Sequence, residues 1–572
     1  MISVENLTVE FSARPLFHDV SFVVNDHDRI ALVGKNGAGK STLLKILCGL
    51  QRPTSGAVNV PAGETIGYLP QVMKLSDDTT VREETRKAFA GHTEMKARLD
   101  RMQREMAQRT DYESESYLEL IDSFTQAQEW AMMSYLARVS YNYDSRYLLT
   151  ANFRADGSSK LAPGKRWGYF PSVSAGWRIS QEEFLKDVDW LSELKLRGGW
   201  GQTGNQAGIS SYAYLQRYSI TRQNWWESGK GDAMITLAPN SFSNPNLTWE
   251  TTTQTNFGID LGLFQNRLNL AVDAYLKKTT DLLLEVDLPA TSPIRKIYRN
   301  EGEMTNKGLE VNIDSRNLTG EFTWNTNFNI SFNKNELTKL TLQKIYDGAL
   351  INNVTSENVV RLTEGQPLGK FWGLISDGVD PQTGDIKYRD LNGDGKINSS
   401  DKTYIGDPNP DFTFGFTNDF SYKNFTLSVF FQGSYGNDIY NASRIETEGM
   451  YDGKNQSIDV LNRWRKAGDV TDIPRAVRGT DNIKASSRWV EDGSYVRLKT
   501  LTLAYSVPTD ALQKYGIHKV QPYFTAQNLW TLTSYKGFDP EVNENLSGSF
   551  LGIDYGTYPQ TKTFIFGLNI EF

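Results

Sequence analysis

The sequence predicts a mostly β protein, in which a partial antiparallel transmembrane β-barrel follows a shorter α/β region and a helical segment. Three observations support this prediction. From about residue 133 to the last residue, apolar and polar side chains alternate with period two, as in strands with one polar and one apolar face. The chain is also rich in aromatic residues, at 12%, and contains 47 glycines. Near the N-terminus, a glycine-rich phosphate-binding motif lies between an apolar strand and a helix.

The composition excludes several classes of protein. The chain has 572 residues, and its 61 basic and 68 acidic residues give a net charge of −7, so we expect no general nucleic-acid binding. The single cysteine, Cys48, excludes an intramolecular disulfide framework, and four histidines argue against a histidine-rich metal site. The sequence contains no run of about 18 apolar residues, so no transmembrane helix is predicted. The first residues lack the layout of a signal peptide, so the chain as written is expected to begin in the cytoplasm.

The first predicted element is a nucleotide-binding P-loop with the sequence GKNGAGKS, residues 34–41. It fits the pattern GxxxxGK(S/T), with the strand RIALV before it and the helix STLLKILCGL after it. Glycines in such a loop let successive backbone N–H groups converge on a phosphate, and the helix N-terminus adds positive potential. We expect Lys40 to reach the β- and γ-phosphates and the Ser41 hydroxyl to bind Mg²⁺. The other predicted contacts of this motif are Gly34, Asn36, Gly37, Gly39 and Thr42.

Residues 1 to about 130 resemble the ATP-binding cassette superfamily, specifically its soluble ABC-F ATPases. The resemblance is carried by LFHDVSFVVNDHDRIALVGKNGAGKSTLLKILCGLQRPTSGAV and by the following IGYLPQ. It implies that Phe11 stacks on adenine and that Gln71 lies near Mg²⁺ and the attacking water. The signature sequence LSGGQ, a Walker B strand ending in Asp-Glu and a switch histidine are missing; similar stretches at 546–549 and 282–289 are interpreted as a surface loop and a barrel strand. We therefore expect ATP and Mg²⁺ binding at most, with hydrolysis absent or very slow.

Residues 77–132 form the predicted helical segment. The segment is highly charged, and Met95, Leu99, Met102 and Met106 follow one another at helical spacing. We expect an exposed helix or helical hairpin that buries one thin apolar stripe, similar to the start of the helical subdomain of ABC-F proteins. The expected domains are a truncated ATPase core with the P-loop at 1–76, this segment at 77–132 and the barrel part at 133–572.

The largest region is a series of roughly fourteen alternating segments separated by turn signals. In FTWNTNFNISFN, for example, Phe322, Phe328 and Phe332 share one face, whereas asparagines occupy the other. Segments of about ten residues with one aromatic-rich face are typical of a transmembrane β-barrel, and the alternative is a large soluble β-sandwich or β-solenoid. Aromatic loop residues such as Trp372 are interpreted either as stacking platforms for sugar rings or as residues of the aromatic girdle or of packing within the loops.

From about Ser134 to Phe572 the chain resembles the C-terminal part of SusC-like TonB-dependent outer-membrane receptors, which import glycans and peptides. Several ordered blocks carry this resemblance, among them RYLLTANFRADGSSK, KRWGYFPSVSAGWRIS, LKLRGGWGQTGNQ, IGDPNPDFTFGF and the terminal FIFGLNIEF. It implies contact with outer-membrane lipid, with a SusD-like lipoprotein and with TonB, and a role for the terminal Phe572 in barrel assembly. The sequence as given shows neither a plug domain nor a TonB-contacting segment, and it shows only about fourteen of the twenty-two barrel strands, so an incomplete barrel is expected.

One loop of this region has the spacing of a calcium-binding loop. In DLNGDGKINSSD, the positions 1, 3, 5, 7 and 12 are Asp390, Asn392, Asp394, the Lys396 carbonyl and Asp401, with Gly395 at the sharp turn. Oxygen ligands at alternate positions suit Ca²⁺, but position 12 holds Asp in place of the bidentate Glu, which weakens binding. The alternative is a polar turn held by Asx-type hydrogen bonds.

Three functional hypotheses remain. The first is an incomplete, non-enzymatic outer-membrane TonB-dependent nutrient receptor-transporter. The second is an ABC-F type ATP-binding protein. The third is a non-functional fusion of two unrelated genes, joined near residues 125–137 without a Pro/Gly/Ser linker. The larger part predicts location in the outer membrane, whereas the lack of a signal peptide predicts the cytoplasm.

Overall fold

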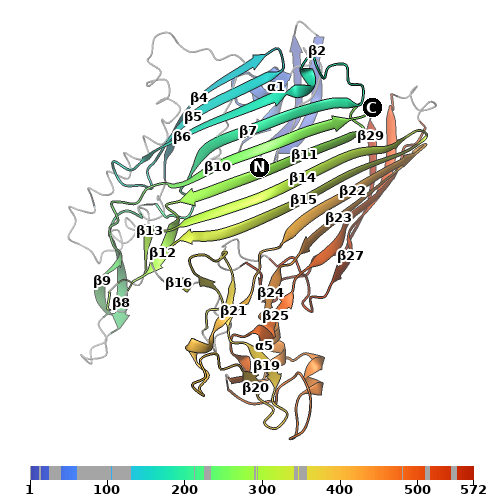
Figure 1. The fold of residues 1–572 in the computed structure, drawn as a ribbon. Coiled ribbons are helices and arrows are strands. Elements are labelled where there is room, and N and C mark those ends of the chain that lie inside the picture. Colours follow the sequence, from blue (N-terminus) through green and yellow to red (C-terminus); the bar gives the residue numbers. More distant parts are fainter. Residues whose placement is uncertain are drawn as a thin grey trace. The chain divides into compact units, whose positions relative to one another are not determined.

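The computed structural model describes residues 2–11, 14–24, 40–60, 105, 130–211, 213–224, 233–288, 291–292, 294, 296–340, 345–346, 357–479, 481–508, 516–542 and 551–571 (Figure 1). The chain divides into two units, residues 1–127 and 128–572, and each is described by itself. None of the described helices is long and apolar enough to cross a membrane.

The first unit contains a small antiparallel sheet and one helix. β1 (Ile2–Phe11) lies between β2 (Arg14–Val24) and β3 (Ser55–Asn59), and α1 spans Lys40–Leu47. Its core is formed by residues of β1, whose register shifts between Val4 and Leu7, and by one side of α1, namely Val4, Leu7, Val9, Leu43 and Ile46. The helix predicted after the P-loop is therefore confirmed over Lys40–Leu47.

The second unit is built on one sheet of thirteen antiparallel strands (Figure 1). In chain order these are β4 (Met132–Tyr143), β5 (Tyr147–Ser158), β6 (Trp167–Arg178), β7 (Leu191–Asn205), β10 (Glu250–Leu263), β11 (Leu268–Thr280), β14 (Glu303–Thr319), β15 (Phe322–Lys339), β22 (Phe412–Tyr422), β23 (Phe425–Tyr435), β26 (Tyr495–Tyr505), β27 (Lys519–Thr533) and β29 (Thr563–Glu571). Their order in the sheet follows the chain from β4 to β29. These thirteen strands thus form one long sheet, as a barrel requires. A β-sandwich would instead consist of two sheets packed face to face.

Each of these strands has one apolar and one polar face, because its residues alternate along the chain. The register between strands then places apolar residues beside apolar ones and polar residues beside polar ones. The apolar face includes Leu149, Val173, Trp177, Leu196, Phe257, Leu270, Val311, Ile330, Phe414, Leu503, Phe524 and Phe566. The polar face includes Asn152, Ser174, Arg197, Asp260, Asp273, Asn312, Asn327, Thr417, Ser428, Thr502 and Thr525. The period-two pattern of the sequence is therefore the pattern of these two faces.

The two ends of the sheet differ in their connections. At the end that we call the short-turn end, tight turns at 144–146, 264–267, 320–321 and 423–424 join successive strands, together with the longer connections 179–190 and 506–518. At the long-loop end the connections are 159–166, 206–249, 281–302, 340–411, 436–494 and 534–562. The smaller elements gather at this second end in Figure 1.

These connections contain several short hairpins and helices. The paired strands are β8 (Arg217–Asn224) with β9 (Ala233–Ser241), β12 (Leu283–Asp287) with β13 (Lys296–Asn300), β16 (Ile345–Tyr346) with β17 (Arg361–Leu362), β18 (Phe371–Gly373) with β21 (Thr403–Gly406), and β19 (Ser376–Val379) with β20 (Ile386–Tyr388). β24 (Asp438–Asn441) lies between β25 (Val490–Asp492) and β28 (Ile553–Asp554), and α5 spans Ser443–Glu448. Their buried core includes Phe371, Tyr440, Ile445, Ile483 and Trp489. The long loops therefore form a folded region with a core of its own.

One predicted barrel strand is wrong. Residues 282–289 were expected to continue a barrel strand, but β11 ends at Thr280 because Asp281 takes a left-handed backbone conformation with φ 56°. The following residues form β12, which pairs only with β13 at the long-loop end. The interpretation of this stretch as something other than a Walker B strand stands, because its partner is antiparallel.

Candidate functional site

The predicted nucleotide site lies largely outside the described residues. Gly34, Asn36, Gly37, Gly39 and Gln71 are all outside them. Phe11 is the last residue of β1, and Lys40 and Ser41 begin α1, but the positions of these three side chains are not described. Thr42 lies half-buried in the first turn of α1. The geometry of the P-loop therefore stays a prediction from the motif.

An ion triad occupies the polar face of the large sheet near its short-turn end. The Arg197 guanidinium donates to Asp260 over 2.8 and 2.7 Å and to Asp273 over 2.9 and 3.0 Å. Gly258, between them, leaves room for this arrangement: a Cβ there would lie 2.4 Å from Asp273 Oδ1 and 2.8 Å from Arg197 Cζ. One cation thus ties three neighbouring strands together, and the glycine is required by the close approach.

Amide side chains continue the polar face on the neighbouring strands. Asn327 Nδ2 donates to Asp314 Oδ1 over 2.6 Å, and Asn312 Nδ2 donates to Asp314 Oδ2 over 3.0 Å. On β5 and β6, Asn152 Nδ2 donates to Ser172 Oγ over 3.1 Å. Amides and hydroxyls of this kind both donate and accept hydrogen bonds, so they suit ligands with many hydroxyl or peptide groups.

A buried arginine joins the last long loop to the sheet. Arg497 on β26 is 1% exposed, and its guanidinium pairs with Asp539 over 2.7 Å, with Glu541, and with Thr531 Oγ1 over 2.9 Å. Lys499 Nζ also lies 3.1 Å from Glu541. Asp539 in turn accepts from the backbone N–H groups of 541 and 560. Because both ends of loop 534–562 bond to the same carboxylate, this cluster fixes the loop at the rim of the sheet. The sequence pattern does not predict this cluster, although the charged residues inside YVRLKTLTLAY are a signal for it.

A second buried ion cluster stabilises the folded long-loop region. Arg444 on α5 donates to both carboxylate oxygens of Glu448, over 2.7 and 2.8 Å, and to Glu491 over 2.6 Å. Beside it, Tyr535 donates to Asp554 over 2.5 Å. Burial, together with this hydrogen bond, raises the pKa of Tyr535 above its ordinary value. Other contacts join the loops 436–494 and 534–562: the backbone N–H of Lys536 donates to Glu491 Oε2 over 2.9 Å, and β24 pairs with β28.

The structure describes the whole predicted calcium loop. Asp390 accepts from the backbone N–H groups of Gly393 and Gly395, both over 2.7 Å, and Asp394 accepts from that of Lys396 over 2.8 Å. Asn392 accepts from the backbone N–H of Asp394 over 3.0 Å. These are the Asx-type bonds of the alternative interpretation.

Asp401 closes the same loop. It accepts from the backbone N–H groups of Asn398 and Leu391, over 2.9 and 3.0 Å, and these bonds, the first above all, hold the pKa of its carboxyl below the ordinary value. Within the described residues, no three His, Cys, Asp or Glu side chains are grouped as a metal site would need. Calcium binding at this loop stays a prediction.

Trp372 is packed among the loops. Its ring meets that of Tyr404 edge-on at 5.1 Å, and the Arg361 guanidinium lies 4.1 Å from its centre. Of the two interpretations of this tryptophan, the geometry supports packing within the loops over an open platform for a sugar ring.

Comparison with known proteins identifies the second unit. The profile of the family described as "TonB dependent receptor-like, beta-barrel" matches residues 98–399. TonB-dependent receptor P3 of Formosa agariphila is 39% identical over 470 residues, which cover 78% of this chain and 46% of that protein. SusC of Bacteroides thetaiotaomicron is 33% identical, with 77% and 44% covered. In three dimensions, the RagAB peptide transporter matches with a TM-score of 0.67 at 27% identity, covering 77% of this chain and 48% of that one. The chain thus spans about half the length of the relatives it matches.

The first unit is similar to different proteins. The profile described as "ABC transporter" matches residues 17–142. The zinc import ATP-binding protein ZnuC of Marinobacter nauticus is 43% identical over 75 residues, which cover 13% of this chain and 29% of that protein. The prediction of a chain that joins two unrelated families is confirmed, whereas the ABC-F branch stays a prediction.

Proposed function

Because this chain belongs to the TonB dependent receptor-like, beta-barrel family, we propose that its second unit forms part of the wall of an outer-membrane receptor-transporter for a glycan or peptide nutrient. The observation that carries the proposal is the large sheet itself, with a polar face, an apolar face and its longest connections, among them 206–249, 340–411 and 436–494, at one end. In outer-membrane barrels the polar face lines the lumen, the apolar face meets lipid, and the longer loops are extracellular.

The substrate class follows from what lines this wall. Amides and hydroxyls offer many hydrogen bonds on this face, and Lys195, 3.7 Å from Asp260, balances the remaining negative charge of the Arg197 triad. Such a surface suits neutral polymers rich in hydroxyl or peptide groups better than strongly charged ones. The name of the RagAB peptide transporter favours a peptide, and the resemblance to SusC-like receptors adds glycans as the second class. A SusD-like lipoprotein and TonB are the corresponding partners in this proposal.

Ligand retention tests the proposal. The full chain, folded into detergent micelles, is examined by native mass spectrometry with maltoheptaose and, separately, with a pool of neutral oligopeptides. We expect one of the two classes to be retained by the folded chain and not by chain diluted from urea without refolding. If neither class is retained, the receptor proposal fails.

A second function is favoured by the match of residues 17–142 to the ABC transporter profile. We propose that the first unit binds ATP with Mg²⁺ but does not hydrolyse it, because the sequence contains no Asp-Glu pair placed to act as the base for water. A fluorescent ATP analogue titrated against the full chain and against Lys40→Ala measures this directly. Binding that is unchanged in Lys40→Ala would show that the P-loop is not the site.

The fusion hypothesis needs its own experiment. Trypsin releases TDYESESYLELIDSFTQAQEWAMMSYLAR, residues 110–138, which spans the join between the two kinds of sequence. Mass spectrometry of cytosolic and outer-membrane fractions detects it if one chain carries both parts, and the fraction that contains it gives the location. If peptides from either side are abundant and this one is missing, the two parts belong to separate proteins.

A further inference from the structure

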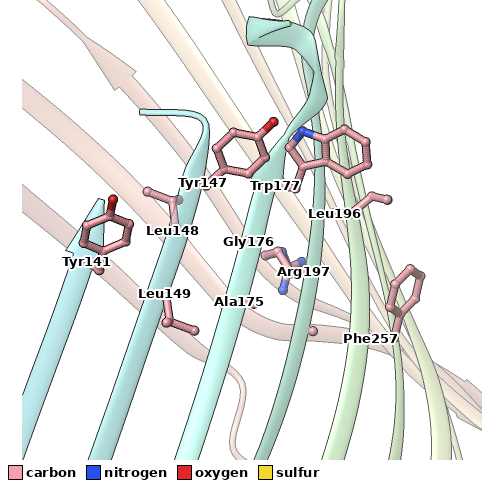
Figure 2. A pocket seen from close by; sticks show the side chains of 11 residues that line it. Tyr141, Tyr147, Leu148, Leu149, Ala175, Gly176, Trp177, Leu196, Arg197 and Phe257 are labelled. Carbon is pink, nitrogen blue, oxygen red and sulfur yellow. The ribbon is translucent and has the colours of Figure 1, made fainter. Parts of the chain in front are cut away.

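We propose that the apolar face of the large sheet carries a specific site for one acyl chain of a phospholipid, in the hollow above Ala175 and Gly198. The hollow has a volume of about 450 Å³ and is lined by residues of β4, β5, β6, β7 and β10 (Figure 2). This volume falls in the range of small-molecule sites, roughly 300–1,000 Å³. The inference rests on the membrane placement that family membership implies, not on the imported substrate.

The strand register explains why a hollow forms at this point. One row of paired residues crosses the sheet from Leu149 to Ala175, Gly198 and Phe257, so the two smallest residues lie between two large ones. The row on the short-turn side contains Trp177 and Leu196, and the row on the other side contains Val173 and Trp200. Large apolar side chains therefore surround a floor of one methyl group and one hydrogen.

The glycine in the floor faces open space. A Cβ added at Gly198 would meet no atom within 4 Å, so the hollow is not an interior gap between packed side chains. Its walls remain accessible, with Tyr141 57%, Leu149 45% and Phe257 53% exposed. The floor is about one strand spacing wide, roughly 5 Å, which suits a single polymethylene chain better than a fused ring.

The rim of the hollow is held rigidly. Glu182 accepts hydrogen bonds from Tyr147 Oη over 2.7 Å and from Trp177 Nε1 over 2.9 Å, and Arg146 donates to it over 3.1 Å. The Tyr147 and Trp177 rings stack with 6.4 Å between their centres and 18° between their planes. Figure 2 shows these two rings at one end of the hollow. One carboxylate thus orients both aromatic walls before any ligand arrives, which reduces the entropy cost of binding.

The depth of the hollow selects its occupant. Ala175 is three residues from Arg178, the last residue of β6 at the short-turn end. At about 3.3 Å per residue and a tilt of about 40°, it lies roughly 7–8 Å below that end, inside an apolar band about 25 Å tall. The aromatic rim coincides with the girdle expected at the membrane interface. The hollow therefore opens to acyl chains of the leaflet on the short-turn side, continuous with the lipid-facing surface.

Quenching of tryptophan fluorescence tests the proposal. The full chain is reconstituted into dioleoyl phosphatidylcholine vesicles that contain increasing fractions of phosphatidylcholine brominated along the acyl chain. The Trp177 signal is the difference between the wild type and Trp177→Phe, since the chain has 13 tryptophans. We expect Trp177 to lose a larger share of its fluorescence than the remaining tryptophans at each brominated fraction, because a chain held in the hollow lies against the Trp177 ring. Quenching of Trp177 in line with the other tryptophans overturns the proposal.

Filling variants identify the site. Gly198→Leu and Ala175→Leu each place a side chain in the hollow, and each should return the Trp177 curve to that of the other tryptophans. The matched control is Ala137→Leu, on the same face of β4 but outside the hollow, which should leave the curve unchanged. Far-ultraviolet circular dichroism verifies folding, and Ala175→Leu serves if the glycine variant does not fold. Unchanged quenching curves in the filled variants would show that lipid does not occupy the hollow. Chemical cross-linking tests the other occupant: dimers that form in the wild type and are lost in the filled variants would show that a second copy of the chain occupies it.

Discussion

Replacing Arg497 by methionine should release the last long loop from the rim of the sheet. Arg497 is 1% exposed, and its guanidinium pairs with both Asp539 and Glu541. Methionine has no charge, so it leaves both carboxylates without this partner. Removing one partner of a buried ion pair costs about 3–5 kcal/mol. Because Lys499 remains 3.1 Å from Glu541, we expect the lower end of that range, about 3 kcal/mol.

Hydrogen exchange measures this loss locally. The backbone N–H of Glu541 donates to Asp539 over 2.8 Å, and that of Gln560 donates to it over 3.1 Å. If opening of the loop becomes easier by about 3 kcal/mol, these two amides exchange roughly 100-fold faster, provided that they open locally. Peptides that contain them are followed by mass spectrometry in the full chain.

The matched control is Arg475→Met. Arg475 pairs with Asp385 over 2.7 Å, but their side chains are 42% and 37% exposed, so loss of the pair should cost less than about 1 kcal/mol. Exchange at Glu541 should not change in this variant. Comparable, small effects of the two substitutions would refute the view that burial gives the Arg497 cluster its strength.

Three further predictions follow from single residues. Gly258→Val should destabilise the sheet by about 2–4 kcal/mol, because the new side chain overlaps the Arg197 triad. The control is Gly198→Ala, whose added methyl group meets no atom within 4 Å. Equal midpoints of urea unfolding for the two variants would contradict the steric argument. The lowered pKa of Asp401 means that its contribution to loop stability is present above the unfolded value, about 3.9, and is lost as the pH falls through the lower folded pKa. The protection of the Asn398 amide from exchange, relative to an unstructured amide at the same pH, should therefore fall in acid, and Asp401→Asn should remove this dependence. If the 390–401 loop binds Ca²⁺, a chelator lowers the melting temperature of the full chain, and an unchanged melting temperature counts against the ion.

The alternating strands could be predicted from the sequence because their pattern is local. FTWNTNFNISFN lies in β15 and TKTFIFGLNIEF contains β29, since one face of each strand is apolar and no other fold period fits. The end of β11 could not be predicted in the same way. A left-handed backbone at Asp281 ends the strand, whereas the apolar pattern continues into LLLEVD.

The contacts of the candidate sites depend on tertiary structure. Arg497 and its partners are about forty residues apart, so the sequence pattern alone does not pair them. The hollow above Gly198 depends on which residues of four strands share one row, and a shift of one residue would move them to the other face. The Asx-type turn at 390–401 is predictable from the sequence as an alternative to a calcium loop, because its hydrogen bonds join residues two or three positions apart.

The strict neighbour order of the thirteen strands also determines how the sheet comes apart under force. A pull along the chain from β4 detaches strands one after another, because each is held only by its neighbours in sequence. The slack released at each rupture equals the length of the connection freed, at up to about 3.5 Å per residue. The connection freed is shortest at the turns 320–321 and 423–424 and longest at 340–411, where the folded loop region must also unravel. A force–extension trace would therefore record the spacing of the strands in chain order.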